Sequence, residues 1–201
     1  MRTLIFCVLV LVIALRQLPA QQSGDTSALN ENQKLAREIF RELVEINTTI
    51  NKGSTKAAEA MASRLRKAGF ASGDLKLVGP APQHQNLVVH YRGKGILPPV
   101  LFIGHLDVVE ALPGDWSMDP FKFTERGGYF YGRGTLDMNG DDASLVANLI
   151  RLRQEGFTPD RDIIVALTEN EEGGDANGVQ WLLNNRRDLI NADYCINPDG
   201  G

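Results

Sequence analysis

The sequence is poor in cysteine, in histidine and in net positive charge, and these shortages exclude several classes of protein. Two of the 201 residues are cysteine, too few for a disulfide scaffold. Lys and Arg number 21 against 25 Asp and Glu, giving a formal charge of −4, which argues against a nucleic-acid-binding surface. A hydrophobic fraction of 43% excludes a disordered chain and is sufficient for one well-filled core.

The sequence also lacks an apolar run of the roughly 20 residues that a membrane-spanning helix needs. Its longest apolar run, residues 4–15, follows an arginine and is followed by a Pro-Ala pair and a polar stretch. This order predicts a secretory signal peptide over residues 1–20, with an uncleaved N-terminal membrane anchor as the alternative. Residues 21–29 are polar and small and are interpreted as a flexible lead-in. The remainder, residues 30–201, is therefore expected in a secreted or periplasmic location.

Residues 30–69 have the periodicity of two amphipathic helices. A capping box of Asn30 and Gln33 is predicted to open the first helix. Ser54 is the expected N-cap of the second, which ends at Gly69. The apolar positions recur at helical spacing, at Leu35, Ile39, Leu43 and Ile46 in the first helix and at Ala57, Met61 and Leu65 in the second.

Beyond these helices, short β-branched and aromatic runs alternate with helical segments. Strands are predicted over residues 86–91, 100–104, 161–168 and 192–197, a hairpin over 121–131, and helices over 141–155 and 178–189. This alternation predicts an α/β fold, in which a mixed, mostly parallel sheet has helices on both faces.

Polar residues follow the predicted strands at their carboxyl ends, where such sheets bind ligands. They are His105, Asp107, Asp137, Glu171, Glu172 and Asp199. Taken singly, each is explained as a turn residue, a solvated acid or a hydrogen-bonded pair, and Asp137 or Asp141 could cap the helix that follows. Taken together, converging carboxylates stay charged only near cations, and oxygen and imidazole ligands suit zinc, manganese or cobalt. Their number favours a two-metal site over one closed tetrahedral zinc.

Five motifs connect these residues to a known family. They are GHLDVV at 104–109, Trp116 with the DPF stretch at 119–121, YGRGTLDMNGD at 131–141, LTENEEGG at 167–174 and DYCINPDGG at 193–201. In order and spacing they resemble the metallopeptidases and amidohydrolases that include glutamate carboxypeptidase, aminoacylase, carnosine-type dipeptidases and succinyl-diaminopimelate desuccinylase. The sequence departs from the pattern at Asn139 and Asn170, where relatives often have Lys and Asp, and neither is a ligand position.

The resemblance implies two divalent metal ions, zinc first, with cobalt or manganese as alternatives. It implies four ligands, which are His105 and Asp199 for the first ion, Glu172 for the second, and Asp137 bridging both. Asp107 is implied to orient the His105 ring. Glu171 is implied to be the general base, which takes a proton during attack on the carbonyl and passes it to the leaving amine.

The resemblance also implies that residues 30–201 are the N-terminal portion of a catalytic domain. A further histidine ligand and a domain that forms a homodimer would then follow Gly201. His84, in a predicted loop, and His90, in a predicted strand, are not expected to be ligands.

The implied function is metal-dependent hydrolysis of peptide or N-acyl amide bonds, of the carboxypeptidase, dipeptidase or aminoacylase type. The substrate would be a small peptide or an N-acyl amino acid, and the 201 residues alone are expected to be inactive. The alternative is a non-catalytic, receptor-like or binding ectodomain that retains the fold.

Overall fold

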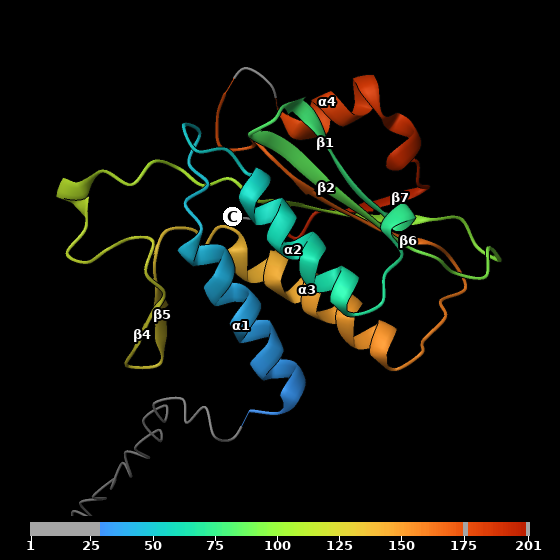
Figure 1. The fold of residues 1–201 in the computed structure, drawn as a ribbon, viewed down its shortest axis with the longest axis horizontal. Helices are drawn as coiled ribbons and strands as arrows, with labels where there is room; N and C mark the ends of the chain where they lie inside the picture. The colour runs from blue at the N-terminus through green and yellow to red at the C-terminus, as the bar shows by residue number, and fades with distance from the viewer. Residues whose placement is uncertain (1–28, 175–176, 200–201) are drawn as a thin grey trace, which may run out of the picture.

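The computed structural model describes residues 29–174 and 177–199. These residues form a five-stranded sheet with helices packed on it and a separate two-stranded hairpin (Figure 1). The predicted signal peptide and nearly all of the predicted lead-in lie outside the described residues. Among the helices that are described, none has both the length and the apolar character needed to cross a membrane.

The first two helices lie where the sequence predicts them. In α1 (Glu31–Glu45) the capping box is present: the Gln33 N–H donates to Asn30 Oδ1 at 2.9 Å and the Asn30 N–H donates to Gln33 Oε1 at 3.0 Å. Ser54 precedes α2 (Thr55–Lys67), but its side chain makes no capping hydrogen bond. The buried face of α2, which includes Met61 and Leu65, therefore stabilises this helix by packing.

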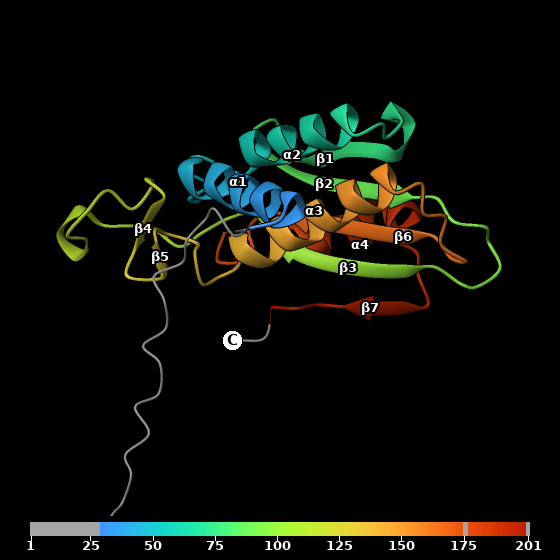
Figure 2. The same ribbon diagram turned by 90° about the horizontal axis from the view of Figure 1, so that it is seen from below.

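The main sheet has the strand order β1-β2-β6-β3-β7. Its strands are β1 (Leu75–Ala81), β2 (His84–Tyr91), β3 (Val100–His105), β6 (Ile163–Thr168) and β7 (Tyr194–Ile196). β3 runs parallel to both β6 and β7, whereas β2 runs antiparallel to both β1 and β6. The predicted mixed sheet is confirmed, with as many antiparallel as parallel pairings among the described strands. Figure 2 shows β7 at the edge beyond β3.

Strand β1 was not predicted from the sequence. Its segment contains Gly79 and Pro80, which usually indicate a turn. Pairing with β2, in which Leu75 lies opposite Val89, places it in the sheet. The close contact with β2 also explains Gly79, since a Cβ there would lie 1.9 Å from the His84 carbonyl oxygen.

Helices cover both faces of the sheet, as predicted. Successive residues of a strand point to opposite faces, so β2 and β6 contribute to two separate cores. One core, with Val89 and Leu167, packs against α1, α2 and α3 (Asn139–Gln154). The other, with Val88 and Ala166, packs against Leu182 of α4 (Gly178–Asn185). β6 is covered on both faces and lies beside the parallel strand β3, and these two strands end at Thr168 and His105, opposite each other.

Two predicted helices differ in detail from the observed ones. α3 begins at Asn139, and neither Asp137 nor Asp141 supplies a capping hydrogen bond. Its buried face includes Val146 and Ile150, and Leu145 and Leu152 are partly buried against the same core. The predicted helix over 178–189 is α4 followed by a separate 3₁₀ turn (Arg187–Leu189), because the backbone leaves the helical region at Arg186.

The predicted hairpin is present as β4 (Thr124–Arg126) and β5 (Tyr129–Tyr131). Gly127 and Gly128 connect the strands with φ of 62° and 81°, the left-handed conformation that a tight hairpin turn of this kind requires. The hairpin packs on α1 through aromatic edges: the Phe40 ring lies 5.2 Å from Phe123 and 5.4 Å from Phe130.

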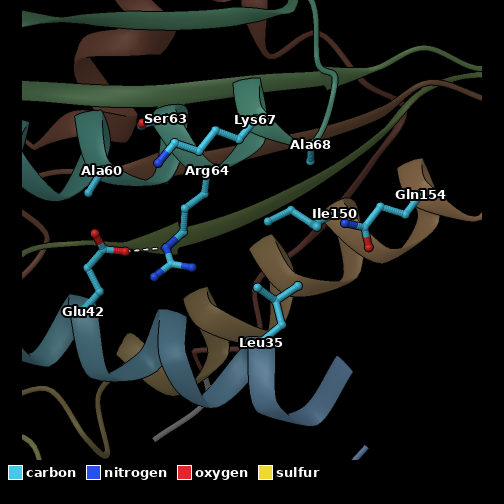
Figure 3. Close-up of a pocket in the computed structure, with 9 residues that line it drawn as sticks. All are labelled: Leu35, Glu42, Ala60, Ser63, Arg64, Lys67, Ala68, Ile150 and Gln154. Atoms are coloured by element: carbon cyan, nitrogen blue, oxygen red, sulfur yellow. Dashed lines mark hydrogen bonds and ion pairs between the residues drawn. The ribbon is translucent and has the colours of Figure 1, made fainter. Parts of the chain in front are cut away.

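A groove of about 430 Å³ lies between α1, α2 and α3 (Figure 3). It contains the ion pair of Arg64 with Glu42. Ile150 and Gln154, which line it, lie near the C-terminal end of α3, whereas the N-terminal end follows Asp137. Because α3 is about 24 Å long at 1.5 Å per residue, this groove is remote from the strand ends that carry the candidate site.

Candidate metal centre and catalytic loop

Strand β3 delivers His105 to the carboxyl end of the sheet. The residue lies opposite Thr168 of the parallel strand β6, and the Leu106 N–H donates to the Thr168 carbonyl at 2.7 Å. The Thr168 hydroxyl donates to the Gly104 carbonyl at 3.0 Å. The His105 N–H donates to Met138 Sδ at 3.2 Å, in the loop between β5 and α3. The imidazole is 2% exposed.

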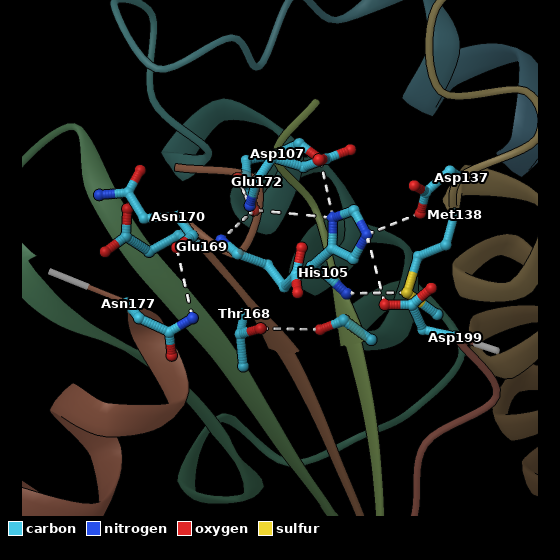
Figure 4. A network of polar contacts seen from close by, with 12 residues as sticks. His105, Asp107, Asp137, Met138, Thr168, Glu169, Asn170, Glu172, Asn177 and Asp199 are labelled. Atoms are coloured by element: carbon cyan, nitrogen blue, oxygen red, sulfur yellow. Dashed lines mark hydrogen bonds and ion pairs between the residues drawn. The ribbon is translucent and has the colours of Figure 1, made fainter. Parts of the chain in front are cut away.

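The two ring nitrogens of His105 face different groups (Figure 4). Nδ1 lies 2.9 Å from the backbone carbonyl of Asp107, which can only accept, so Nδ1 carries a hydrogen and donates. Nε2 lies 2.9 Å from Asp137 Oδ1 and 3.9 Å from Asp199 Oδ2. The structure therefore brings together His105, Asp137 and Asp199, whose ligand atoms lie within 4.8 Å of one another.

This arrangement fits a divalent metal ion. With Nδ1 donating, a neutral ring presents the Nε2 lone pair to two carboxylates, and a cation between them satisfies all three groups. Without a metal ion, a proton on Nε2 of His105 also compensates the two carboxylates that face this nitrogen. Burial lowers the pKa of His105, but the Asp137 hydrogen bond, the Asp107 carbonyl and the nearby negative charges outweigh it, so the net pKa is raised. One nitrogen with carboxylate oxygens is a ligand set suited to zinc, manganese or cobalt.

The backbone carbonyl of Asp107 contacts the His105 ring. Its carboxylate contacts the loop that follows β6. Its Oδ1 lies 3.7 Å from His105 Nδ1, too far for a hydrogen bond. Instead, Oδ1 accepts the N–H of Glu171 and Oδ2 the N–H of Glu172, each at 3.0 Å. The Asp107 side chain is buried, and these two backbone N–H groups give each of its oxygens a hydrogen-bond donor. Asp107 thus couples the His105 strand end to the Glu171–Glu172 loop.

Glu171 and Glu172 lie on one loop but have different surroundings. Glu171 is exposed, whereas Glu172 is partly buried. Burial raises the pKa of Glu172, and the Asp137 charge raises it further, against the opposing effect of His105. Glu172 therefore lies within electrostatic reach of the His105–Asp137–Asp199 cluster without being one of its members.

Asp142 was missed by the sequence analysis. It is fully buried in the first turn of α3, and neither carboxylate oxygen has a hydrogen-bond partner among the described residues. Burial raises its pKa well above the usual value, with His105 opposing the rise and other acids adding to it. Asp142 precedes Val146 by four residues and Leu149 by seven, so helical spacing places it on the same buried face as these apolar residues. This spacing is the feature of the sequence that could have indicated its burial.

A second missed feature is a contact between His84 and Glu169. His84 is the first residue of β2 rather than part of a loop, so that prediction was wrong. Its Nδ1 lies 2.9 Å from Glu169 Oε2, across 85 residues of sequence. No local pattern could reveal this pair, because it depends on the pairing of β2 with β6.

The fold and this site define a class of protein, the catalytic domains of metallopeptidases and amidohydrolases. The sequence model described as "Peptidase family M20/M25/M40" matches residues 101–201. This chain belongs to that family, and the resemblance seen in its motifs is confirmed.

Among curated proteins, the chain is similar to a succinyl-diaminopimelate desuccinylase from Delftia acidovorans, with 37% identity over 143 residues that cover 69% of this chain and 36% of the relative. Among solved structures it is similar in fold to an M20 family metallo-carboxypeptidase, Sso-CP2, from Sulfolobus solfataricus. That match has a TM-score of 0.69 at 19% identity and covers 86% of this chain and 38% of the other.

The YXEP protein of Bacillus subtilis, described as a dinuclear metal binding peptidase of the M20 family, is similar in fold with a TM-score of 0.51 at 11% identity. The match covers 74% of this chain and 38% of that one. The chain spans less than half the length of the curated relatives that it matches.

Proposed function

We propose that this chain forms the N-terminal part of the catalytic domain of a secreted or periplasmic hydrolase that cleaves peptide or N-acyl amide bonds with the help of two divalent metal ions. The observation that carries the proposal is the convergence of His105 Nε2 with the carboxylates of Asp137 and Asp199 within 4.8 Å. These three residues come from three separate segments, so their convergence is a property of the fold.

The ligand assignment follows from this convergence. His105, Asp137 and Asp199 would hold the first ion, and Asp137 with Glu172 would contribute to the second. The ions, zinc in our proposal, supply polarisation of the substrate carbonyl and a lowered pKa for the attacking water. The effect of the Asp137 charge on the pKa of Glu172 supports placing these two carboxylates around a shared positive charge.

The chain's own residues supply the proton transfer and the positioning. Glu171 is exposed just beyond the carboxyl end of β6. Its carboxylate can therefore take a proton from the attacking water and return it to the leaving amine. The Asp107 carboxylate accepts hydrogen bonds from the N–H groups of Glu171 and Glu172. These bonds fix the position of the backbone from which both glutamate side chains extend. The Asp107 carbonyl keeps the hydrogen on Nδ1 of His105, so that Nε2 is free to bind a metal.

The substrate class proposed is a small peptide or an N-acyl amino acid. A desuccinylase among the relatives and a carboxypeptidase among the similar folds both support hydrolysis of an amide bond beside a free amino acid. We propose a homodimer for the whole protein, formed through a domain outside this chain, and a secreted or periplasmic location on the basis of the predicted signal peptide.

The test uses the full-length gene product. Metal is removed with a chelator, zinc is restored, and hydrolysis of a panel of dipeptides and N-acyl amino acids is measured together with bound zinc. We expect two zinc ions per chain and turnover that depends on them. His105→Ala should lose both, while His90→Gln, on a histidine that contacts the Leu189 carbonyl, should keep both.

Turnover that is unaffected by the chelator would contradict the proposal. A protein that binds no stoichiometric pair of metal ions and hydrolyses nothing would instead be a non-catalytic ectodomain with the same fold.

A further inference from the structure

A hydrogen-bonded pair lies directly behind the loop that carries Glu171 and Glu172. The Glu169 side chain is completely buried, while the His84 side chain is 23% exposed. His84 Nδ1 lies 2.9 Å from Glu169 Oε2, and Glu169 Oε1 has no partner in the described part of the chain. This single contact therefore holds the Glu169 carboxylate.

The backbone of Glu169 is fastened at the same place. Its N–H donates to Asn86 Oδ1 at 3.1 Å, and its carbonyl accepts the N–H of Gly178 at 2.8 Å. Asn86 in turn donates from Nδ2 to the Val78 carbonyl at 2.9 Å. Glu169 is thus joined by its side chain and by both backbone groups to the β1–β2 hairpin and to the start of α4.

After Glu169 the chain turns sharply into the loop that carries Glu171 and Glu172. Asn170 has φ of 54°, the left-handed region, which Asn tolerates better than most residues. Immediately afterwards the N–H groups of Glu171 and Glu172 donate to Asp107. Asn177, at the start of α4, also donates from Nδ2 to the Asn170 carbonyl at 3.4 Å. The loop is therefore held by Asp107 on the His105 side, and by Glu169 and Asn177 on the side of β2 and α4. Because Asn170 alone separates Glu169 from Glu171, we expect a shift at Glu169 to move the glutamate side chains.

A buried carboxylate is an expensive way to fill space, because burial disfavours its charge unless a partner compensates. Burial raises the pKa of Glu169, and the His84 hydrogen bond opposes that rise. An apolar residue would fill the same volume without this cost, but it could not bind His84.

We propose that His84 and Glu169 are positioning residues that fix the Glu171–Glu172 loop from behind and thereby aim its two carboxylates. The inference rests on the proposed roles of Glu171 and Glu172. It adds two residues to the apparatus of the site, one of them 85 positions away in sequence.

The test compares Glu169→Ala, Glu169→Gln and His84→Ala in the zinc-loaded full-length protein. Hydrogen exchange of the Glu171 and Glu172 amides is the first measurement. We expect exchange at least about tenfold faster in both alanine variants, with unchanged exchange in the amides of β3 and β6. Glu169→Gln keeps an oxygen that accepts from His84 and should restore the wild-type exchange. His90→Gln changes the other histidine on the same face of β2 and should leave the loop unaffected.

Hydrolysis of the dipeptide panel is the second measurement. In the alanine variants we expect kcat to fall by about 10²-fold with KM changed less than about threefold, because the loop carries the proton-transfer group rather than the substrate. Wild-type loop exchange in the alanine variants would overturn the proposal, as would equal acceleration throughout the sheet, which is the result of a purely structural pair.

Two further outcomes are also decisive. If Glu169→Ala does not fold, His84→Ala alone decides, because wild-type loop exchange in that variant would refute the pair's role. If the wild-type protein shows no turnover, the proposed function fails, while hydrogen exchange still decides whether the pair orders the loop.

Discussion

At the scale of single residues, the carboxylates of the site divide by what their oxygens contact. Asp137 and Asp199 face His105 Nε2, whereas Asp107 binds backbone N–H groups. Glu171 belongs to neither set: its side chain is exposed, and among the described residues its N–H donates to Asp107. Residues of one chemical type therefore have different contacts, which the surrounding chain determines.

Glu171→Gln tests the role of the exposed carboxylate. Gln has the same shape but cannot accept a proton, so turnover of the zinc-loaded full-length protein should fall by about 10²–10⁴-fold. Zinc content should stay unchanged, because Glu171 is not part of the His105 cluster. The measurement is kcat together with zinc stoichiometry. Turnover equal to wild type would remove Glu171 from the chemistry.

Asp142→Asn tests the buried, unpaired carboxyl group. The pKa of Asp142 is raised in the folded chain, so the unfolded chain ionises first as pH rises. The stability associated with this group is therefore fully present below the unfolded pKa and is lost as pH rises toward the folded pKa. Asn does not ionise and avoids this loss.

We expect the gain in unfolding free energy of Asp142→Asn over wild type to be about 1–3 kcal/mol larger at pH 7 than at pH 4. Urea unfolding of chelator-treated protein at both pH values measures it. A difference between variant and wild type that is the same at both pH values would show that Asp142 does not titrate in this way.

At the scale of elements, the start of α4 is packed against Asn86 and Glu169, which lie behind the Glu171–Glu172 loop. A Cβ on Gly178 would lie 2.2 Å from Asn86 Oδ1 and 2.7 Å from the Glu169 carbonyl oxygen. No side chain fits there without moving backbone, so the close approach of α4 to β2 and β6 depends on glycine at this position.

Gly178→Ala should therefore lower the free energy of unfolding by about 1–3 kcal/mol. Gly73→Ala is the matched control, because no atom lies within 4 Å of the Cβ position of Gly73 among the described residues. Urea unfolding of the two variants side by side measures the effect. If the two variants were equally stable, α4 would be able to move away from β2 and β6 without a loss of unfolding free energy.

The elements also show how far the sequence predicts the fold. α1 was predicted together with its capping box, because the box and the period of Ile39 and Leu43 are local features. β1 was not predicted, since Gly79 and Pro80 carry the opposite local signal and pairing with β2 overrides it. The helix predicted over residues 178–189 is divided into α4 and a 3₁₀ turn, because the backbone leaves the helical region at Arg186.

At the scale of the whole molecule, the His105 cluster joins three segments that lie far apart in the chain. β3, the loop before α3 and the segment after β7 each contribute one candidate ligand. A metal ion bound to all three would link these segments, and anything that binds the folded chain but not the unfolded one stabilises the fold.

Zinc should therefore raise the thermal stability of the chelator-treated protein. At a zinc concentration about 100-fold above the dissociation constant, the gain is about 2.7 kcal/mol. His105→Ala should lose the gain and His90→Gln should keep it, as measured by thermal unfolding with and without zinc. Equal stabilisation of wild type and His105→Ala would place the bound zinc elsewhere.

The sequence by itself determined the local features of this protein: where helices begin, which runs form the central strands, and which acids and which histidine follow the strand ends. These depend on near neighbours along the chain, and their order is enough to identify the family. The tertiary structure alone decided that Asp107 binds the next strand end through its carboxylate, that Asp142 is buried, and that His84 meets Glu169. Each of these contacts depends on the order and register of the strands, which bring distant segments together and which no local pattern specifies.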